Sequence, residues 1–229
     1  VGESGVASSI AGVPFFSDSS NKSIYTHDVS GTDSTAAGNT AFGFSAMDAI
    51  TTGDDNTAFG ENAGTALTTG SLNVAIGKNA LATEDVGTKS IAIGANALNA
   101  QNVDGSVHNI AIGNDAGKLI TTGLYNIMIG GQAGDGFDTE SENVGIGTSA
   151  LGGSIAGGEY NVCVGSNTLD ALTSADHNVA VGYSAGGAVT TGGYNVMVGT
   201  MAGLDHTTGQ NCVFIGANAG GNNTTGSGD

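Results

Sequence analysis

The chain has 229 residues, of which 41 are Gly and 1 is Pro, and its formal net charge is −17. This acidic balance excludes a nucleic-acid partner, because 4 Lys and Arg residues cannot line a phosphate-binding groove. High Gly without a Gly at every third position excludes collagen, and 39% hydrophobic residues exclude a solvated disordered coil. No apolar run approaches the roughly 20 residues of a membrane helix, so no membrane insertion is expected.

Residues 1–38 are less regular than the rest and are predicted to form an N-terminal cap or a degenerate coil. The segment 12–16 (Gly-Val-Pro-Phe-Phe) holds the single Pro and an apolar cluster. We expect it to cap the first coil, because an open strand edge invites further pairing. The segment 21–25 (Asn-Lys-Ser-Ile-Tyr) begins 18 residues before Asn39 and is interpreted as a decayed coil start at Asn21.

From residue 39 to residue 229 the chain repeats one pentapeptide: Asn, a β-branched residue, a small residue, a large apolar residue and Gly. There are eleven copies, with starts 17 residues apart except for one gap of 19 and one of 18. Coil position 5 is Gly in all eleven copies and position 1 is Asn in nine, and six copies end in Thr-Thr-Gly. Clear representatives of positions 1 and 5 are Asn39 and Gly43, Asn56 and Gly60, Asn73 and Gly77, Asn109 and Gly113, and Asn178 and Gly182.

Each repeat is predicted to form one coil of an all-β solenoid of about eleven 17-residue coils. Positions 2 and 4 are Thr, Val, Ile or Phe, which is typical of strands, and the following Gly permits a sharp bend. So much Gly with so many β-branched residues disfavours a helix. Position 1 Asn should stack on itself, with side-chain amides bonding from coil to coil. The off-length copies that start at Ser90 and Asn143 should bulge outward as loops.

Both faces of the repeated strand are apolar, which favours an oligomer. Positions 2 and 4 share one face and position 3 lies on the other. Position 3 is never polar, so one face should line the coil interior and the other should meet a second copy of the chain. The predicted oligomer face consists of position 3 residues: Ala41, Ala58, Ala75, Ala92, Ala111, Met128, Ala180 and Met197. A flattened monomer covered by its own loops is the alternative.

The repeats resemble the head repeats of trimeric autotransporter adhesins (YadA-like) and the Gly-rich repeats of trimeric phage tail fibres. The resemblance covers residues 39–229, and residues 39–73 are the nearest match to the tail fibres. It implies a left-handed parallel β-roll, a homotrimer around one axis, an extracellular place on a virion or cell surface, and a role in surface recognition. The polar stretch 220–229 offers no strong cap, so it either frays or continues end to end into another subunit.

Few residues suggest chemistry, and no cofactor or enzymatic activity is expected. Cys163 and Cys212 fall three coils apart, too far for a disulfide within the chain, and are interpreted as small buried residues. His108 and His177 each precede a position 1 Asn but lie four coils apart, so one chain cannot place both on one metal. A ring of one such His around a threefold axis is the alternative.

The acidic residues cluster at Asp54–Asp55, Glu84–Asp85, Asp104 and residues 135–142, where we expect exposed turns. Paired carboxylates could cleave glycosidic bonds, but the spacing fixes no separation between them. The acidic turns could bind calcium, but the chain lacks the Gly-Gly-x-Gly-x-Asp repeat of calcium-binding solenoids. Ice binding is disfavoured because the Thr-Thr pairs are adjacent and lapse in five copies.

The leading hypothesis is therefore a structural fibre segment, like a phage tail-fibre shaft or head, that supports attachment to a host or cell surface. The alternative is a bacterial adhesin or a self-assembling surface filament. No residue identifies the receptor or glycan. The expanded segment 99–108 and the acidic segment 135–142 are the candidate receptor-binding loops.

Overall fold

The computed structural model describes residues 8–10, 13–18, 23–25, 35–153 and 158–228. It confirms the predicted all-β solenoid, with 12 parallel strands in about 11 coils roughly 17 residues apart. The chain forms two compact units, residues 1–108 and residues 109–229. No helix in the described ranges is long and apolar enough to span a membrane.

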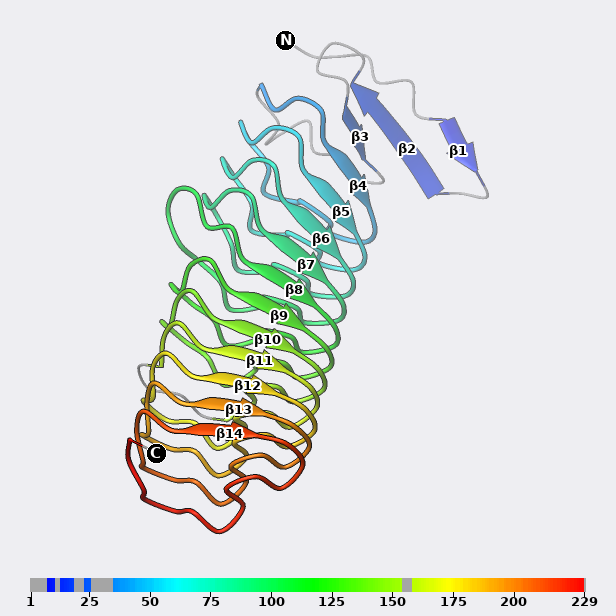
Figure 1. The fold of residues 1–229 in the computed structure, drawn as a ribbon. Helices are drawn as coiled ribbons and strands as arrows, with labels where there is room; N and C mark the ends of the chain where they lie inside the picture. Colours follow the sequence, from blue (N-terminus) through cyan, green and yellow to red (C-terminus); the bar gives the residue numbers. More distant parts are fainter. Residues whose placement is uncertain (1–7, 11–12, 19–22, 26–34, 154–157, 229) are drawn as a thin grey trace. The chain divides into compact units, whose positions relative to one another are not determined.

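The first unit combines an antiparallel start with a parallel stack (Figure 1). Its strands are β1 (Ser8–Ile10), β2 (Val13–Asp18), β3 (Ser23–Tyr25), β4 (Thr40–Phe42), β5 (Thr57–Phe59), β6 (Val74–Ile76) and β7 (Ile91–Ile93). Strand β2 pairs antiparallel with both β1 and β3. Strands β3 to β7 then pair parallel in sequence order. An antiparallel strand therefore lies along the edge of β3.

The coil register at β3 differs from the prediction that a decayed coil starts at Asn21. Ile24 pairs with Thr40, a position 2 residue, and Tyr25 pairs with Ala41, a position 3 residue. Ser23 therefore occupies position 1, and its Oγ accepts a hydrogen bond from the backbone N–H of Asn39 (3.1 Å). The prediction was wrong by two residues, because the hydroxyl of Ser23 replaces the Asn side chain as acceptor. Residue 21 itself lies outside the described ranges.

The second unit is a parallel stack throughout (Figure 1, green to red). Its strands are β8 (Ile110–Ile112), β9 (Ile127–Ile129), β10 (Val144–Ile146), β11 (Val162–Val164), β12 (Val179–Val181), β13 (Val196–Val198) and β14 (Val213–Ile215). Each pairs in register with the next, so that equal coil positions lie side by side, as in Val162 beside Val179.

Residues with positive φ turn the chain at fixed places in the coil. Position 5 Gly has φ between +119° and +147°, and a Cβ on Gly130 would lie 2.5 Å from the carbonyl carbon of Gly147 in the next coil. No larger residue fits there, because the backbones of stacked coils approach too closely. Positions 7, 9 and 17 are also left-handed, although many carry side chains, such as Asn79, Leu81 and Tyr194.

The buried Asn at position 1 holds the coils together with both ends of its amide. In Asn178 the Nδ2 donates to the carbonyl of Gly192, 14 residues later, which closes the coil (3.0 Å). Its Oδ1 accepts the backbone N–H of Asn195, the first residue of the next coil (3.0 Å). Direct amide-to-amide bonds also occur, for example from Asn178 to Asn161 (3.2 Å). The predicted Asn ladder is confirmed, with coil closure as an additional role.

Small residues fill the narrow core of the coils. Position 8 is a buried Ala in most coils, and Thr168, the exception, donates its hydroxyl hydrogen to the carbonyl of Gly165 (2.8 Å). Large residues at positions 9 and 12, such as Leu81 and Phe137, complete the interior. The core is therefore a column of short side chains with a few large ones between them.

The two off-length copies have different outcomes. In the copy that starts at Ser90, four of the five residues 102–106 are exposed, as expected for an outward loop. Gln101 lies just before this loop and donates from Nε2 to Ser90 Oγ (2.9 Å), which replaces the missing Asn amide. In the copy that starts at Asn143, residues 154–157 lie outside the described ranges.

Candidate interaction surface

The predicted oligomer face is wrong, because position 3 side chains lie inside their own coil. Ala41, Ala58, Ala75, Ala92, Ala111, Met128, Ala180 and Met197 are all at most 2% exposed within the single chain. The physical reason is alternation: the buried Asn at position 1 bonds across the coil, so position 3 points inward with it. The outer face of the strand consists instead of positions 2 and 4.

This outer strand face is apolar and partly or fully exposed in every coil of the second unit. Every position 2 and position 4 side chain there is Ile or Val, from Ile110 and Ile112 in β8 to Val213 and Ile215 in β14. An ordinary soluble surface carries scattered single apolar residues, whereas these exposed aliphatic side chains form a continuous row. The second unit therefore presents a continuous apolar strip along its parallel strands.

The first unit has the same face with different residues. In β4 and β5 the outer positions hold Thr and Phe, and the rings of Phe42 and Phe59 stack with centroids 5.0 Å apart. In β6 and β7 they hold Val and Ile. Phe44, two residues after Phe42, is 81% exposed. Aromatic surface thus extends the apolar strip at one part of this unit.

A column of aromatic rings lies beside the strip in the second unit, at the last residue of each coil, directly before position 1. The ring of His177 stacks on Tyr160 (centroids 4.9 Å apart) and on Tyr194 (4.8 Å). All three residues are exposed and have positive φ. The sequence interpretation noted His177 only as a possible metal ligand and missed the column. Its signal was available as Tyr, His and Tyr at 17-residue spacing.

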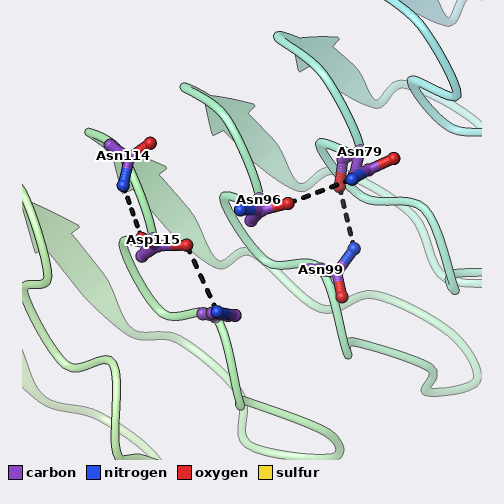
Figure 2. A network of polar contacts seen from close by, with 6 residues as sticks. Asn79, Asn96, Asn99, Asn114 and Asp115 are labelled. Carbon is purple, nitrogen blue, oxygen red and sulfur yellow. Dashed lines mark hydrogen bonds and ion pairs between the residues drawn. The ribbon is translucent and has the colours of Figure 1, made fainter.

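A second Asn column in the first unit was also missed. At position 7, Asn62 donates to Asn79 (3.1 Å). Asn79 donates to Asn96 (3.1 Å), and Asn99 donates to the Asn79 carbonyl (3.1 Å) (Figure 2). These amides are only partly buried. They link successive coils through their turns, which is a structural role.

The predicted roles of Cys and His are resolved in part. Cys163 and Cys212 are free and buried, as predicted, and burial raises the pKa of the Cys163 thiol. His206 is also buried: its Nδ1 lies 3.1 Å from the carbonyl oxygen of Asn223, and its ring packs edge-on against Phe214. Within the described ranges no three His, Cys, Asp or Glu side chains gather as metal ligands.

The prediction that the acidic clusters are exposed is wrong for two residues. Glu84 is fully buried, where its carboxylate accepts hydrogen bonds from the backbone of Gly87 (2.7 Å) and from Gln101 Nε2 (2.9 Å). Glu140 is 2% exposed, and its carboxylate accepts the backbone N–H of Asp138 (2.7 Å). Both carboxylates thus lie inside the coil, where they accept hydrogen bonds from neighbouring residues.

Two turn carboxylates have raised pKa values. Partial burial raises the pKa of Asp170. Partial burial, together with the neighbouring Asp115 carboxylate, raises the pKa of Asp135, although its backbone hydrogen bond and Lys118 oppose the rise. Lys118 forms an ion pair with Asp115 (3.4 Å), whose side chain also contacts Asn114 (Figure 2).

The first Thr of five Thr-Thr pairs, from Thr51 to Thr207, bonds within the stack. Thr190 Oγ1 donates to the carbonyl of Thr207 (3.2 Å), and Thr207 Oγ1 donates to that of Thr224 (2.9 Å). These hydroxyls therefore serve the coil stack, and in these five pairs only the second Thr is classed as exposed. This arrangement does not provide the two parallel rows of free hydroxyls that an ice-binding face would use.

No protein-family model, curated protein or solved structure matches this chain.

Proposed function

We propose that this protein is a structural fibre subunit that self-associates as a homotrimer through the outer strand face and supports attachment to a host or cell surface. The observation that carries the proposal is the exposed apolar strip formed by positions 2 and 4. A bacterial adhesin or a surface filament subunit would use the same face in the same way. The number three and the extracellular place come from the resemblance of the repeats.

Charge favours a second copy of the chain as the occupant of this face. The chain has a net charge of −17, so contacts between most parts of two copies are repulsive. The outer strand face carries only Thr, Phe, Val and Ile and therefore brings no like charges together. Burial of this face would gain about 25 cal/mol for each Å² of apolar area removed from water.

The repeat distance of the face also favours a second copy. Neighbouring parallel strands lie about 4.7–4.9 Å apart, so the Val and Ile side chains recur at that spacing along the strip. Another copy carries the same recurrence and can match it coil by coil. A globular partner without such a repeat would match the strip only locally.

The test is the mass and shape of the chain in solution, by light scattering and small-angle scattering. We expect an elongated particle with three times the chain mass of 22.2 kDa. A variant with Val179→Glu and Val181→Glu on the outer face of β12 should be monomeric, because it places charges inside the contact. A control with Thr191→Glu and Thr208→Glu changes the charge equally on exposed turns and should keep the parent mass. A compact monomeric parent would overturn the proposal.

A further inference from the structure

Over β11 to β13 the outer strand face cannot by itself fix how copies align along the stack. Strands β11, β12 and β13 each carry Val at both outer positions. Within these strands a copy displaced by one coil would therefore again meet Val at both outer positions. A repeating face of this kind specifies its register weakly.

The aromatic column differs from coil to coil over these same strands. Tyr160, His177 and Tyr194 come directly before the coils that contain β11, β12 and β13. The same place in the coil is Glu142 in the coil before Tyr160, Asn211 in the coil after Tyr194, and Tyr125 one coil before Glu142. The column is thus a bounded block of three rings, whereas the adjoining Val columns are uniform.

The exposure of these rings shows that they do not serve the coil core. Tyr160, His177 and Tyr194 have φ of 59°, 58° and 60°, a left-handed conformation that is unfavourable for side chains other than glycine. Tyr160 is 44% exposed and Tyr194 is 59% exposed, so the rings fill no core. The left-handed backbone belongs to the coil, because Glu142 and Asn211 at the same place have φ of 61° and 59°; the exposure of the rings leaves them available to another copy.

We infer that the Tyr160–His177–Tyr194 column sets the axial register between copies of the chain. This inference rests on the proposed self-association. In the aligned arrangement the three rings of one copy lie level with the three rings of the next. A displacement by one coil leaves one ring opposite Asn211 and places Glu142 opposite another, so one aromatic pair is lost and a carboxylate replaces it. Each lost pair should lower the population of the displaced arrangement roughly twofold to tenfold per contact.

The test measures distances between copies by double electron–electron resonance. A spin label is placed at Thr191→Cys, on an exposed turn of the second unit, in a background with Cys163→Ala and Cys212→Asn. The register variant carries Tyr160→Asn, His177→Asn and Tyr194→Asn, because Asn tolerates the left-handed backbone. The control variant carries Thr139→Asn, Ser174→Asn and Thr208→Asn on exposed turns. Circular dichroism checks the fold of each variant.

We expect a narrow distance distribution for the labelled parent and for the control, and several populations for the register variant at unchanged oligomer mass. A register variant with the single parent distance would overturn the register role and leave the proposed function intact. A monomeric register variant would also overturn it, because the column would then be required for association itself. A monomeric parent would instead overturn the proposed function.

Discussion

The Met128 side chain occupies the space that a side chain on Gly134 would need: a Cβ there would lie 2.5 Å from the Met128 sulfur. Positions 3 and 9 share core volume in several coils. Met197 and Phe214 also face Gly at position 9, in Gly203 and Gly220. Conversely, the small position 3 residues Ala75, Gly145 and Cys163 accompany Leu81, Leu151 and Leu169.

This shared volume predicts strong coupling between Met128→Ala and Gly134→Leu. Met128→Ala alone should cost about 2–5 kcal/mol of unfolding free energy through the cavity it leaves. Gly134→Leu alone should cost at least about 1–3 kcal/mol through overpacking. The double variant should lie within about 1.5 kcal/mol of the parent, because it recreates the Ala and Leu pair of other coils. Urea unfolding measures all three.

Met128→Ala combined with Gly203→Leu is the matched control. Gly203 packs against Met197 rather than Met128, so the two costs should add within about 0.5 kcal/mol. Additive costs for Met128→Ala and Gly134→Leu as well would show that positions 3 and 9 do not share volume.

Gly130→Ala should disrupt the stack, because the new Cβ meets the Gly147 backbone of the next coil. The φ of +136° adds strain of its own. The expected loss is at least about 3 kcal/mol, measured by urea unfolding. Gly216→Ala is the matched control: its φ is +119°, but its Cβ meets no atom within 4 Å. Equal losses at both sites would mean that backbone strain, and not the contact between coils, requires Gly.

Asn178→Ala should destabilise the second unit by about 2–4 kcal/mol, because it leaves two buried backbone groups without partners. These are the carbonyl of Gly192 and the N–H of Asn195. Thermal unfolding followed by circular dichroism measures the loss. The exposed Asn222→Ala should change stability by no more than about 0.5 kcal/mol. A similarly small effect at Asn178 would contradict the role of the position 1 Asn in closing one coil and linking it to the next.

The raised pKa values of Asp135 and Asp170 predict that stability falls as pH rises. A carboxyl whose folded pKa exceeds its unfolded value favours folding below the ordinary pKa of 3.8, and this contribution is lost as pH rises through the folded pKa. The double variant Asp135→Asn and Asp170→Asn should therefore melt higher than the parent at pH 7, with a gain that shrinks toward pH 3. The exposed Asp205→Asn is the control. A gain that grows on acidification would contradict the assignment.

The fold could be predicted from the sequence because each sequence repeat corresponds to one coil. Gly and β-branched residues at fixed spacing predict strand, bend and coil length. Apolarity could not decide which strand positions face the coil interior, since positions 2, 3 and 4 are nearly all apolar. The decisive signal was Asn178 and its equivalents: an amide that bonds within the coil stack fixes position 1 inward, and position 3 follows by alternation.

The backbone conformation of the aromatic column was beyond prediction, although the 17-residue spacing of its rings was visible in the sequence. Left-handed backbone at Tyr160, His177 and Tyr194 cannot be inferred from residue type, because Tyr and His adopt that conformation only rarely. Likewise, nothing in composition shows that Glu84 is buried, because its partner Gln101 comes from the next coil, which contains the two-residue expansion.

The two ends of the position 1 amide give the stack a direction of growth. Asn178 closes its own coil through Gly192, which follows it in the chain, and its Oδ1 accepts the first N–H of the next coil. A finished coil is thus a template for its successor. A nascent chain leaving the ribosome N-terminus first presents the coils in this same order, so each turn can fold on the one just completed without waiting for distant sequence.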